Sequence, residues 1–520
     1  MKKIFELLVI FTFINPQYLW ANSNSLSYAS FQDRPKLVVL IVIDQFRADY
    51  LTRFQDQFLK AKKTNGELGG FRFLMENSAY YPFATYDVFQ NMTCPGHAMI
   101  STGSRPYRNG INLNEYYDRG LKRLVYCAED EKFGISPNRL KTTNFSDEYK
   151  NAGLPSKVFS LALKDRSAVM LGGHRADLAL WMDYDHFKWT TSSYYSKKNP
   201  AWLDQANDEL KKLDDVTISI DGSPVKILSK KGLSYSKGID LTFELAEKVL
   251  TAEKLGLNKQ TDFLSLSLST HDMLGHKLGL NAKEMQDLTL FEDKRLSDFL
   301  NRLKKHLGSL DQVEIFLTAD HGVAPAVDYA QAAKLDSGKI DYLEIYRLVN
   351  KKLDQEFGEI KNKSWIAASK SLHFYYDPEV LEKKKLKSAD LNKFIKSTLK
   401  DVKGVYTVVL NDDLENHKFP IGVLGDQMQK QYLNEKSGDF ILVPDAFYMD
   451  KDENLTTHLT GYTYDKTVPL ILFGSKFKKG VYSDEALVID LAPTINFSLG
   501  VIAPALSEGK VLPVFTNTSK

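Results

Sequence analysis

Lys36-Leu-Val-Val-Leu-Ile-Val-Ile-Asp44 is a continuous apolar run between two charged residues. Most of its residues are β-branched and no polar residue alternates with them, which is typical of a strand buried on both faces. Strands of this kind belong to parallel sheets whose two faces are covered by helices. The run ends in Asp44, so we expect a carboxylate at the carboxyl end of this strand.

Three later stretches predict further strands, at residues 261–270, 313–319 and 468–474. Amphipathic helical stretches at residues 241–254 and 288–306 lie between the earlier strands. Strands that alternate with helices along the chain indicate a largely parallel sheet. The predicted fold class is therefore α/β.

Acidic and imidazole side chains follow three of the predicted strands. Asp44 ends the first strand, His271-Asp272 follows the second, and Asp320-His321 follows the third. In open α/β sheets the ligand crevice lies beyond the carboxyl ends of the strands. One such aspartate is typical of a turn or a helix cap, whereas three of them with histidines nearby indicate a functional site.

The length of 520 residues suits one large α/β domain with insertions, or roughly two to four smaller domains. We expect a catalytic α/β domain at residues 30–322 and 451–515, interrupted by an inserted α+β subdomain at residues 323–450. An aromatic-rich segment at about residues 175–240 is interpreted as an insertion over the site. The formal net charge of +2 gives no indication of a nucleic-acid partner, and we expect a monomer.

The first 21 residues have the pattern of a signal peptide. Two lysines precede an apolar run at residues 4–14, and a cleavage point after Ala21 leads into a polar stretch. The alternative is a membrane anchor, which needs about 20 apolar residues. The sequence predicts export to the periplasm or the extracellular space, with no stable membrane insertion after the leader is removed.

A hydroxyl residue precedes a Pro-Gly pair in Asn-Met-Thr-Cys-Pro-Gly-His-Ala, residues 91–98. Threonine is a favoured helix N-cap, and proline is tolerated in the first turn of a helix. A helix N-terminus also presents free N–H groups and a positive dipole end, which suit a phosphoryl group. Thr93 is therefore either a helix cap or a nucleophile at a phosphate site.

The chain has two cysteines, Cys94 and Cys127. An exported protein tends to oxidise such a pair where the geometry allows it. A disulfide beside Thr93 and two free buried thiols are both compatible with the sequence.

Carboxylates and imidazoles occur at spacings that suit a metal. Asp272 and His276 are four residues apart, which places both on one face of a helix, and a plain ion pair is the alternative. Asp320-His321 is a second mixed pair, and His458 lies in a polar segment without hydrophobic periodicity. Mixed nitrogen and oxygen ligands favour Zn²⁺ over Mg²⁺ or Ca²⁺. Two further histidines near these motifs are candidates for supporting contacts: His97 and His174.

As an ordered set, these residues resemble the motifs of the alkaline phosphatase superfamily. The nearest resemblance is to PafA-like alkaline phosphatases with a threonine nucleophile, and to the related nucleotide pyrophosphatase/phosphodiesterases. The resemblance implies a three-layer sandwich around a largely parallel central sheet. The residues that carry it are Asp44, Thr93-Cys-Pro-Gly-His97, Asp272-x₃-His276, Asp320-His321-Gly322 and His458.

The resemblance also implies two zinc ions and a covalent intermediate. Asp272, His276 and His458 would hold one ion. Asp44, Asp320 and His321 would hold the other, together with Thr93. Two ions suit in-line displacement, because one activates a weak hydroxyl and the other stabilises the leaving oxygen. A phosphothreonine on Thr93 would be the intermediate.

Lys164 and Arg166 bear on the substrate. Residues two apart in an extended chain point to the same side, and two cations suit a dianionic phosphoryl group. A charged turn after a strand is the alternative. The stretch resembles the Lys-Asp-Arg segment of PafA-like monoesterases, which the diesterases lack. Asn114 resembles the asparagine that binds a nonbridging phosphoryl oxygen, with Asn112 as a rival by position.

The sequence thus predicts an exported zinc-dependent alkaline phosphatase that hydrolyses small-molecule phosphate monoesters. A phosphodiesterase or nucleotide pyrophosphatase of the same superfamily is the first alternative. A non-catalytic zinc-containing envelope protein that binds a ligand is the second. A sulfatase is excluded, because Cys94-Pro95 does not fit the Cys-x-Pro-x-Arg motif that formylglycine formation needs.

Overall fold

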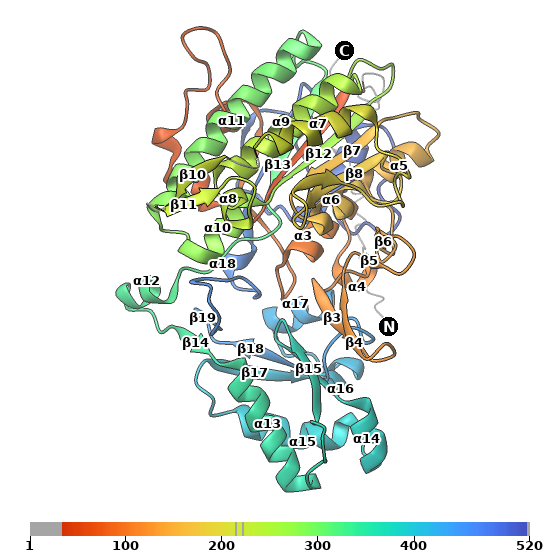
Figure 1. Ribbon diagram of the computed structural model, residues 1–520, viewed down its shortest axis with the longest axis vertical. Helices are drawn as coiled ribbons and strands as arrows, with labels where there is room; N and C mark the ends of the chain where they lie inside the picture. Colours follow the sequence, from red (N-terminus) through yellow and green to blue (C-terminus); the bar gives the residue numbers. More distant parts are fainter. Residues whose placement is uncertain (1–33, 214–215, 221–222, 517–520) are drawn as a thin grey trace, which may run out of the picture.

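The computed structural model describes residues 34–213, 216–220 and 223–516, so the predicted leader lies outside the described residues. The upper part of the molecule in Figure 1 is built on a nine-stranded sheet. From one edge to the other its strands are β21 (Gly480–Val481), β2 (Ala79–Thr85), β20 (Thr467–Phe473), β13 (Val313–Thr318), β1 (Leu37–Ile43), β12 (Asp262–Leu268), β7 (Val158–Ala162), β8 (Leu178–Asp183) and β9 (Lys188–Thr190).

The centre of this sheet is parallel. β1 pairs in parallel with β12 and β13, and the parallel pairing continues from β12 through β7 to β8. Every residue of β1 is buried, because helices cover both faces of the sheet. β20 joins the sheet antiparallel to both β13 and β2. The predicted α/β class and largely parallel sheet are confirmed.

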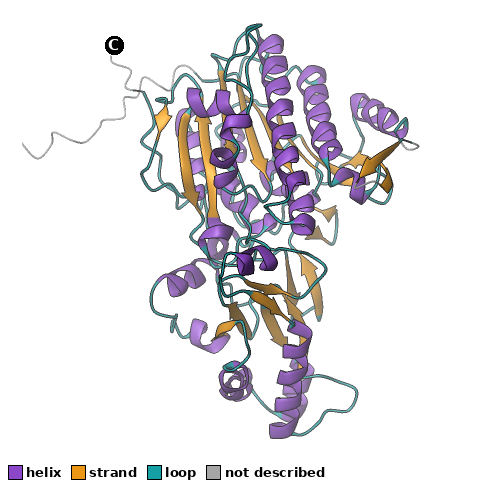
Figure 2. Cartoon of the chain, turned by 90° about the vertical axis from the view of Figure 1, so that its left-hand side faces the viewer, coloured by secondary structure: helices purple, strands orange, loops and turns teal. Residues whose placement is uncertain are grey.

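Two groups of helices cover the two faces of the sheet (Figure 2). One group contains α9 (Ser236–Ala252) and α11 (Lys283–Leu307), which pack against each other. α9 buries Ile239, Phe243, Ala246 and Leu250, a spacing that places one apolar stripe towards the sheet. The other group contains α3 (Thr93–Thr102), α6 (Asp165–Gly172) and α19 (Leu491–Ser498).

Helix α3 approaches the end of β13 closely, at Gly96. A Cβ atom at this position would lie 2.3 Å from the carbonyl oxygen of Asp320, so glycine is required there. All residues of α3 are buried. The close contact brings the start of α3 against the carboxyl edge of the sheet.

The lower part of the molecule has its own antiparallel sheet and hydrophobic core. The sheet order is β15 (Ile366–Lys370), β16 (His373–Tyr376), β18 (Phe440–Pro444) and β17 (Val405–Leu410). α13 (Tyr342–Phe357) and α15 (Ser388–Leu399) pack together beneath it. These elements, which we call the lower unit, lie within the segment predicted as an inserted α+β subdomain.

The aromatic-rich segment at residues 175–240, which we interpreted as an insertion over the site, begins with two strands of the central sheet. β8 and β9 form one edge of the nine-stranded sheet, and Trp181 and Trp189 on them are buried. Because successive strand residues point to opposite faces, Trp189 packs in the main hydrophobic core and Trp181 in a smaller cluster on the other face. The helix α7 (Ala201–Lys211) and a small hairpin follow.

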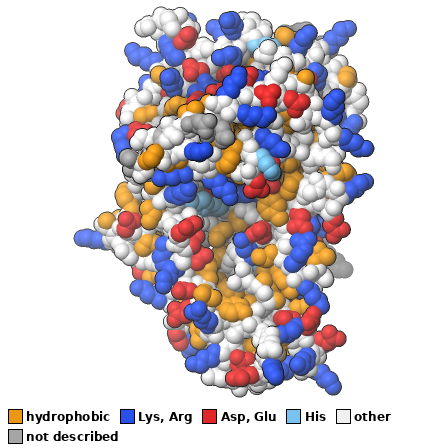
Figure 3. Space-filling view, viewed as in Figure 1, with side chains coloured by type: hydrophobic (Ala, Val, Ile, Leu, Met, Phe, Trp, Pro, Cys, Tyr) orange, Lys and Arg blue, Asp and Glu red, His pale blue; other side chains and the backbone are white. Residues whose placement is uncertain are grey.

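The face seen in Figure 3 mixes basic and acidic side chains over both parts of the molecule, and hydrophobic atoms gather around the waist between them. This mixture agrees with the small net charge. In the described ranges of the chain, every helix falls short of the length or the apolar character that crossing a bilayer would require.

Candidate active site

Three carboxylates meet at the carboxyl edge of the central sheet. Asp44 follows β1, Asp320 lies just beyond β13, and Asp272 lies in α10 (Thr270–Leu278) after β12. β13, β1 and β12 are neighbours in the sheet, so their ends lie side by side. All three carboxylates are buried. The convergence predicted from the sequence is therefore present.

The six predicted metal ligands other than Thr93 form two clusters. Within each cluster the candidate ligand atoms lie within 4.8 Å of one another. The clusters adjoin, because the rings of His321 and His458 stack with centroids 3.5 Å apart. The first cluster is Asp272, His276 and His458, and the second is Asp44, Asp320 and His321.

The imidazoles of these clusters are oriented by backbone carbonyl groups. Nδ1 of His276 bonds the carbonyl oxygen of Thr456 at 3.0 Å, and Nδ1 of His458 bonds that of Asn91 at 2.7 Å. Nδ1 of His321 bonds the carbonyl oxygen of Gly322 at 2.9 Å. A carbonyl oxygen only accepts, so each Nδ1 carries a proton, and each Nε2 is the nitrogen that faces the carboxylates of the clusters.

The charges and unpaired atoms of the second cluster fit a cation. Asp44 Oδ1, Asp320 Oδ2 and His321 Nε2 are buried without a hydrogen-bond partner among the described residues, which is rare in a folded protein. Burial and the charge of Asp44 hold the pKa of Asp320 well above its ordinary value. A divalent ion would pair these atoms and offset the crowded negative charge.

Lys164 joins the two clusters. Its Nζ donates to Asp44 Oδ2 at 2.6 Å and to Asp272 Oδ2 at 2.5 Å. Burial alone would raise the pKa of Asp44, but Lys164 beside it brings the pKa below the ordinary value. The ammonium group thus lies between the carboxylates of Asp44 and Asp272 and offsets part of their negative charge.

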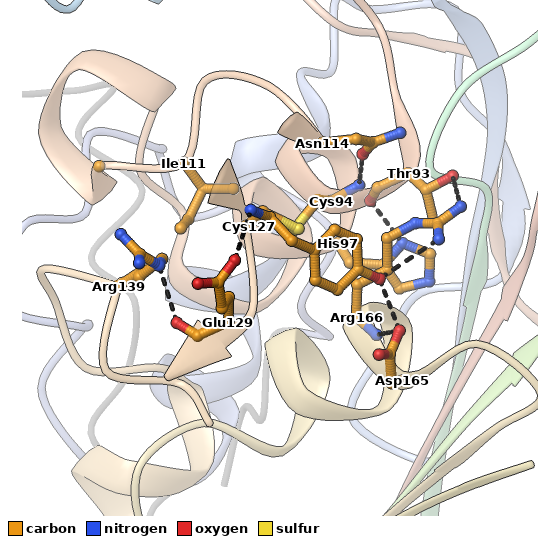
Figure 4. Close-up of a disulfide and its surroundings, with 12 residues drawn as sticks. Thr93, Cys94, His97, Ile111, Asn114, Cys127, Glu129, Arg139, Asp165 and Arg166 are labelled. Atoms are coloured by element: carbon orange, nitrogen blue, oxygen red, sulfur yellow. Dashed lines mark hydrogen bonds between the residues drawn. A yellow bond between two sulfur atoms is a disulfide. The ribbon is translucent and has the colours of Figure 1, made fainter. Parts of the chain in front are cut away.

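The predicted extended geometry of Lys164 and Arg166 is wrong. β7 ends at Ala162, Lys164 is the N-cap residue of α6, and Arg166 lies in the first turn of that helix. Both side chains still reach the site, because α6 begins at the carboxyl edge of the sheet. Arg166 Nη2 donates to Thr93 Oγ at 3.4 Å (Figure 4).

Thr93 is the first residue of α3, and Met92 is the N-cap residue. Within the described part of the chain no side-chain hydrogen bond caps this helix, so the interpretation of Thr93 as a cap is wrong. The Thr93 side chain is buried beside Arg166. The backbone N–H of Cys94 donates to Asn114 Oδ1 at 2.8 Å, which brings Asn114 to the start of α3 (Figure 4).

Cys94 and Cys127 form a disulfide. Cys94 directly follows Thr93, and Cys127 directly follows β4 (Arg123–Tyr126). The bond therefore ties the start of α3 to the hairpin of β4 and β3 (Glu115–Asp118), which begins next to Asn114.

The two further histidines have different surroundings. His97 Nδ1 bonds the carbonyl oxygen of Thr93 at 2.8 Å and lies 3.3 Å from Asp320 Oδ2. Burial lowers the pKa of His97 to about 4, so its ring is neutral. His174 instead bonds the carbonyl oxygen of Leu140 at 3.1 Å. The rival of Asn114, Asn112, is buried with both side-chain polar atoms unpaired among the described residues.

Gln45 contacts both clusters, and the sequence prediction missed it. Its backbone N–H donates to Asp320 Oδ1 at 3.1 Å, and its Nε2 donates to Asp272 Oδ1 at 2.7 Å. Its φ of 65° lies in the left-handed region, which a non-glycine residue adopts at a cost in free energy. Its place next to Asp44 was the one signal in the sequence.

Comparisons with known proteins agree with this geometry. Residues 38–462 match the family model described as type I phosphodiesterase/nucleotide pyrophosphatase. The chain is 30% identical to the alkaline phosphatase PafA of Elizabethkingia meningoseptica, over 92% of this chain and 94% of that one. It is 29% identical to the alkaline phosphatase PhoV of Synechococcus elongatus, with 92% of each chain covered. The crystal structure of wild-type PafA matches with a TM-score of 0.84 at 29% identity, covering 93% of this chain and 99% of that chain.

Proposed function

The chain belongs to the type I phosphodiesterase/nucleotide pyrophosphatase family, and from this premise we propose that it is an exported, zinc-dependent alkaline phosphatase with Thr93 as its nucleophile. Its extended similarity to alkaline phosphatases identifies it as a phosphoric monoester hydrolase.

One observation carries the proposal: Thr93, two Asp/His clusters and two basic side chains converge on one edge of the sheet. Arg166 lies 3.4 Å from Thr93 Oγ, and Lys164 bonds a carboxylate of each cluster. A monoester carries a dianionic phosphoryl group, which two cations suit. A diester carries one negative charge fewer and needs room for a second ester group. The arrangement therefore favours monoesters.

The two clusters would hold two divalent ions. Their mixed nitrogen and oxygen donors suit zinc, as does the orientation of the three imidazoles, whose Nδ1 atoms bond backbone carbonyl groups and leave Nε2 for a metal. Such ions, when bound, lower the pKa of a hydroxyl group and stabilise charge on the leaving oxygen.

Thr93 would form the covalent intermediate. In the first step the bond from Thr93 Oγ to phosphorus forms while the bond from phosphorus to the ester oxygen breaks, and the leaving alcohol takes up a proton. In the second step a water oxygen bonds to phosphorus while the bond from phosphorus to Thr93 Oγ breaks, and a proton from the water passes to Oγ, so that inorganic phosphate leaves and Thr93 regains its hydroxyl group. Two in-line displacements give retention at phosphorus. Arg166 would hold the phosphoryl oxygens at Thr93 in both steps.

Asn114 would orient the same phosphoryl group. Its Oδ1 accepts from the N–H of Cys94, which leaves its Nδ2 group to donate to a nonbridging oxygen. Preorganised donors of this kind stabilise charge that develops in a transition state.

The disulfide supports the proposed export. Disulfides persist in oxidising compartments and are rare in the cytosol. Cys94 and Cys127 are joined beside the nucleophile. Mass spectrometry of the secreted protein would test the cleavage point after Ala21, and an uncleaved N-terminus would contradict it.

One experiment tests the function. An aryl phosphate monoester and the matching methyl diester are assayed side by side, with and without a chelator. We expect the monoester to be hydrolysed much faster, and activity to disappear with the chelator and return with zinc. A preference for the diester would establish the phosphodiesterase alternative, which the name of the family model favours. No turnover by the zinc-loaded protein would establish the non-catalytic alternative.

A further inference from the structure

The hydroxyl group of Tyr126 lies between Asp165 and Arg166. It donates to Asp165 Oδ1 at 2.5 Å and accepts from Arg166 Nη1 at 3.4 Å. Burial raises the pKa of Tyr126, so the phenol keeps its proton. The phenol donates this proton in its hydrogen bond to the Asp165 carboxylate, so the phenol oxygen can accept a hydrogen bond from the guanidinium.

The place of Tyr126 is fixed by the hairpin and the disulfide. Tyr126 pairs with Glu115 across β3 and β4. The next residue, Cys127, donates its N–H to the carbonyl oxygen of Asn114 at 2.9 Å and is bonded covalently to Cys94. The phenol is therefore tethered to the peptide that follows the proposed nucleophile.

Arg166 depends on this phenol for its position. Its guanidinium bonds Tyr126 through Nη1 and Thr93 through Nη2, while its Nε is buried without a partner among the described residues. Asp165 bonds the backbone N–H of Arg166 at 2.7 Å, so it orients the start of α6 as well as the phenol. Figure 4 shows Arg166 between Thr93 and Asp165. A long, flexible side chain needs such contacts to hold one geometry.

We propose that Tyr126 is a positioning residue that, together with Asp165, holds the guanidinium of Arg166 against the phosphoryl group at Thr93. Tyr126 thereby supports the selectivity for dianionic monoesters. The inference rests on the proposed function, because it assigns Tyr126 a role in binding the same phosphoryl group.

The test compares Tyr126→Phe with a matched control, Tyr116→Phe. The hydroxyl of Tyr116 also accepts from an arginine, Arg139, at 2.9 Å, and it lies on the same hairpin. For Tyr126→Phe we expect kcat/KM for the aryl monoester to fall about tenfold, and the inhibition constant of inorganic phosphate to rise by a similar factor. Hydrolysis of the methyl diester changes less than about twofold in Tyr126→Phe, and Tyr116→Phe changes all three quantities less than about twofold.

A double-mutant cycle with Arg166→Ala separates positioning from a general structural role. Once Arg166 is truncated, Tyr126→Phe has nothing left to position, so we expect no further loss of monoester activity. An equal loss from Tyr126→Phe with and without Arg166 overturns the inference. Equal losses on monoester and diester in Tyr126→Phe also overturn it.

The failure of the proposed function would look different. If the wild-type protein preferred the diester, or if Arg166→Ala spared monoester hydrolysis, the monoesterase assignment itself would be wrong. Circular dichroism and the melting temperature of each variant confirm that the comparison concerns folded protein. Asp165→Asn provides a second variant, and we expect it to shift the monoester-to-diester ratio in the same direction as Tyr126→Phe.

Discussion

Asn114 and Cys94 are joined by a hydrogen bond of 2.8 Å, in which the backbone N–H of Cys94 donates to Asn114 Oδ1. The amide of Asn114 is therefore oriented by the peptide that directly follows Thr93. One contact thus positions both the nucleophile and Asn114, which we propose donates a hydrogen bond to the phosphoryl group. The disulfide from Cys94 to Cys127 reinforces this contact.

Substitution of Asn114 separates these two roles. In Asn114→Ala we expect kcat/KM for a monoester to fall about ten- to a hundredfold, because a hydrogen bond to a charged group is worth roughly 1.5–3 kcal/mol. Asn114→Asp keeps the acceptor for Cys94 but directs a carboxylate at the dianion, so we expect a larger loss with a smaller change in melting temperature. Steady-state kinetics and thermal unfolding measure the two effects. An Asn114→Asp variant more active than Asn114→Ala would contradict the role as donor.

Thr93→Ala tests the covalent step. We expect this variant to lose turnover while it retains zinc, because the Asp/His clusters keep all their ligand atoms. Thr93→Ser retains the hydroxyl and should retain measurable activity. Elemental analysis of the purified protein and a monoester assay provide the two readouts. Full activity of Thr93→Ala would remove Thr93 from the mechanism.

Gln45 provides a test of the metal clusters that does not alter a ligand. In Gln45→Leu the Nε2 donor to Asp272 is lost, while the backbone N–H donor to Asp320 remains. We expect about a ten- to hundredfold weaker affinity for one of two zinc ions, since groups that orient ligands contribute that much. Competition with a fluorescent chelator measures the affinity of each site. The control is Gln286→Leu on α11, where the partly exposed Gln286 donates to Gln57 away from the clusters, and equal affinities in both variants would contradict the prediction.

Much of the fold was predictable because it depends on long apolar patterns. Residues 37–43 are apolar throughout since both faces of β1 are covered, and the aspartate that follows them marks the edge where ligands converge. The spacing of Asp272 and His276 was also informative, because one turn of helix brings Asp272 Oδ1 and His276 Nε2 within 3.1 Å of each other.

Other features depend on contacts that leave no pattern in the sequence. The change from strand β7 to helix α6 occurs within three residues, so the backbone at Lys164 and Arg166 could not be inferred. Gln45 and Tyr126 contact the site through hydrogen bonds to residues distant in the sequence. The cysteine pair likewise had two possible states until the structure placed Cys94 against Cys127.

Glu314, at the start of β13, predicts a pH dependence of stability. Burial raises its pKa from 4.5 to about 7, although Ser498 donates a hydrogen bond to it at 2.6 Å. The folded protein therefore retains a proton that the unfolded chain releases between these values. The contribution of Glu314 to the free energy of unfolding falls as the pH rises through this range, by roughly 3 kcal/mol at most.

The Glu314→Gln variant removes this titration and keeps an acceptor for Ser498. We expect it to be more stable than the wild type at pH 8 and nearly equal to it at pH 4.5. Urea denaturation at both pH values measures the difference, with the exposed Glu485→Gln as control. A difference that does not change with pH would contradict the prediction.

Gln431 lies between β17 and β18 of the lower unit along the chain and contacts the segment that precedes Thr93. It ends α17 (Val423–Gln431), where its Oε1 accepts from the backbone N–H of Gln90 at 2.5 Å and its Nε2 donates to the carbonyl oxygen of Asn112 at 2.9 Å. In Gln431→Ala the buried N–H of Gln90 loses its partner, which costs roughly 1–3 kcal/mol. The segment that leads into α3 should then be less well ordered.

We therefore expect Gln431→Ala to lower kcat for monoester and diester by the same factor, about three- to thirtyfold, with little change in KM. This pattern differs from that of the Arg166 contacts, because the position of Thr93 affects every substrate equally. Gln429→Ala on the exposed side of the same helix is the matched control. Parallel kinetics with both substrates measure the effect. A selective loss of monoester activity would show instead that Gln431 acts on phosphoryl recognition, because a displaced nucleophile cannot discriminate between the two esters.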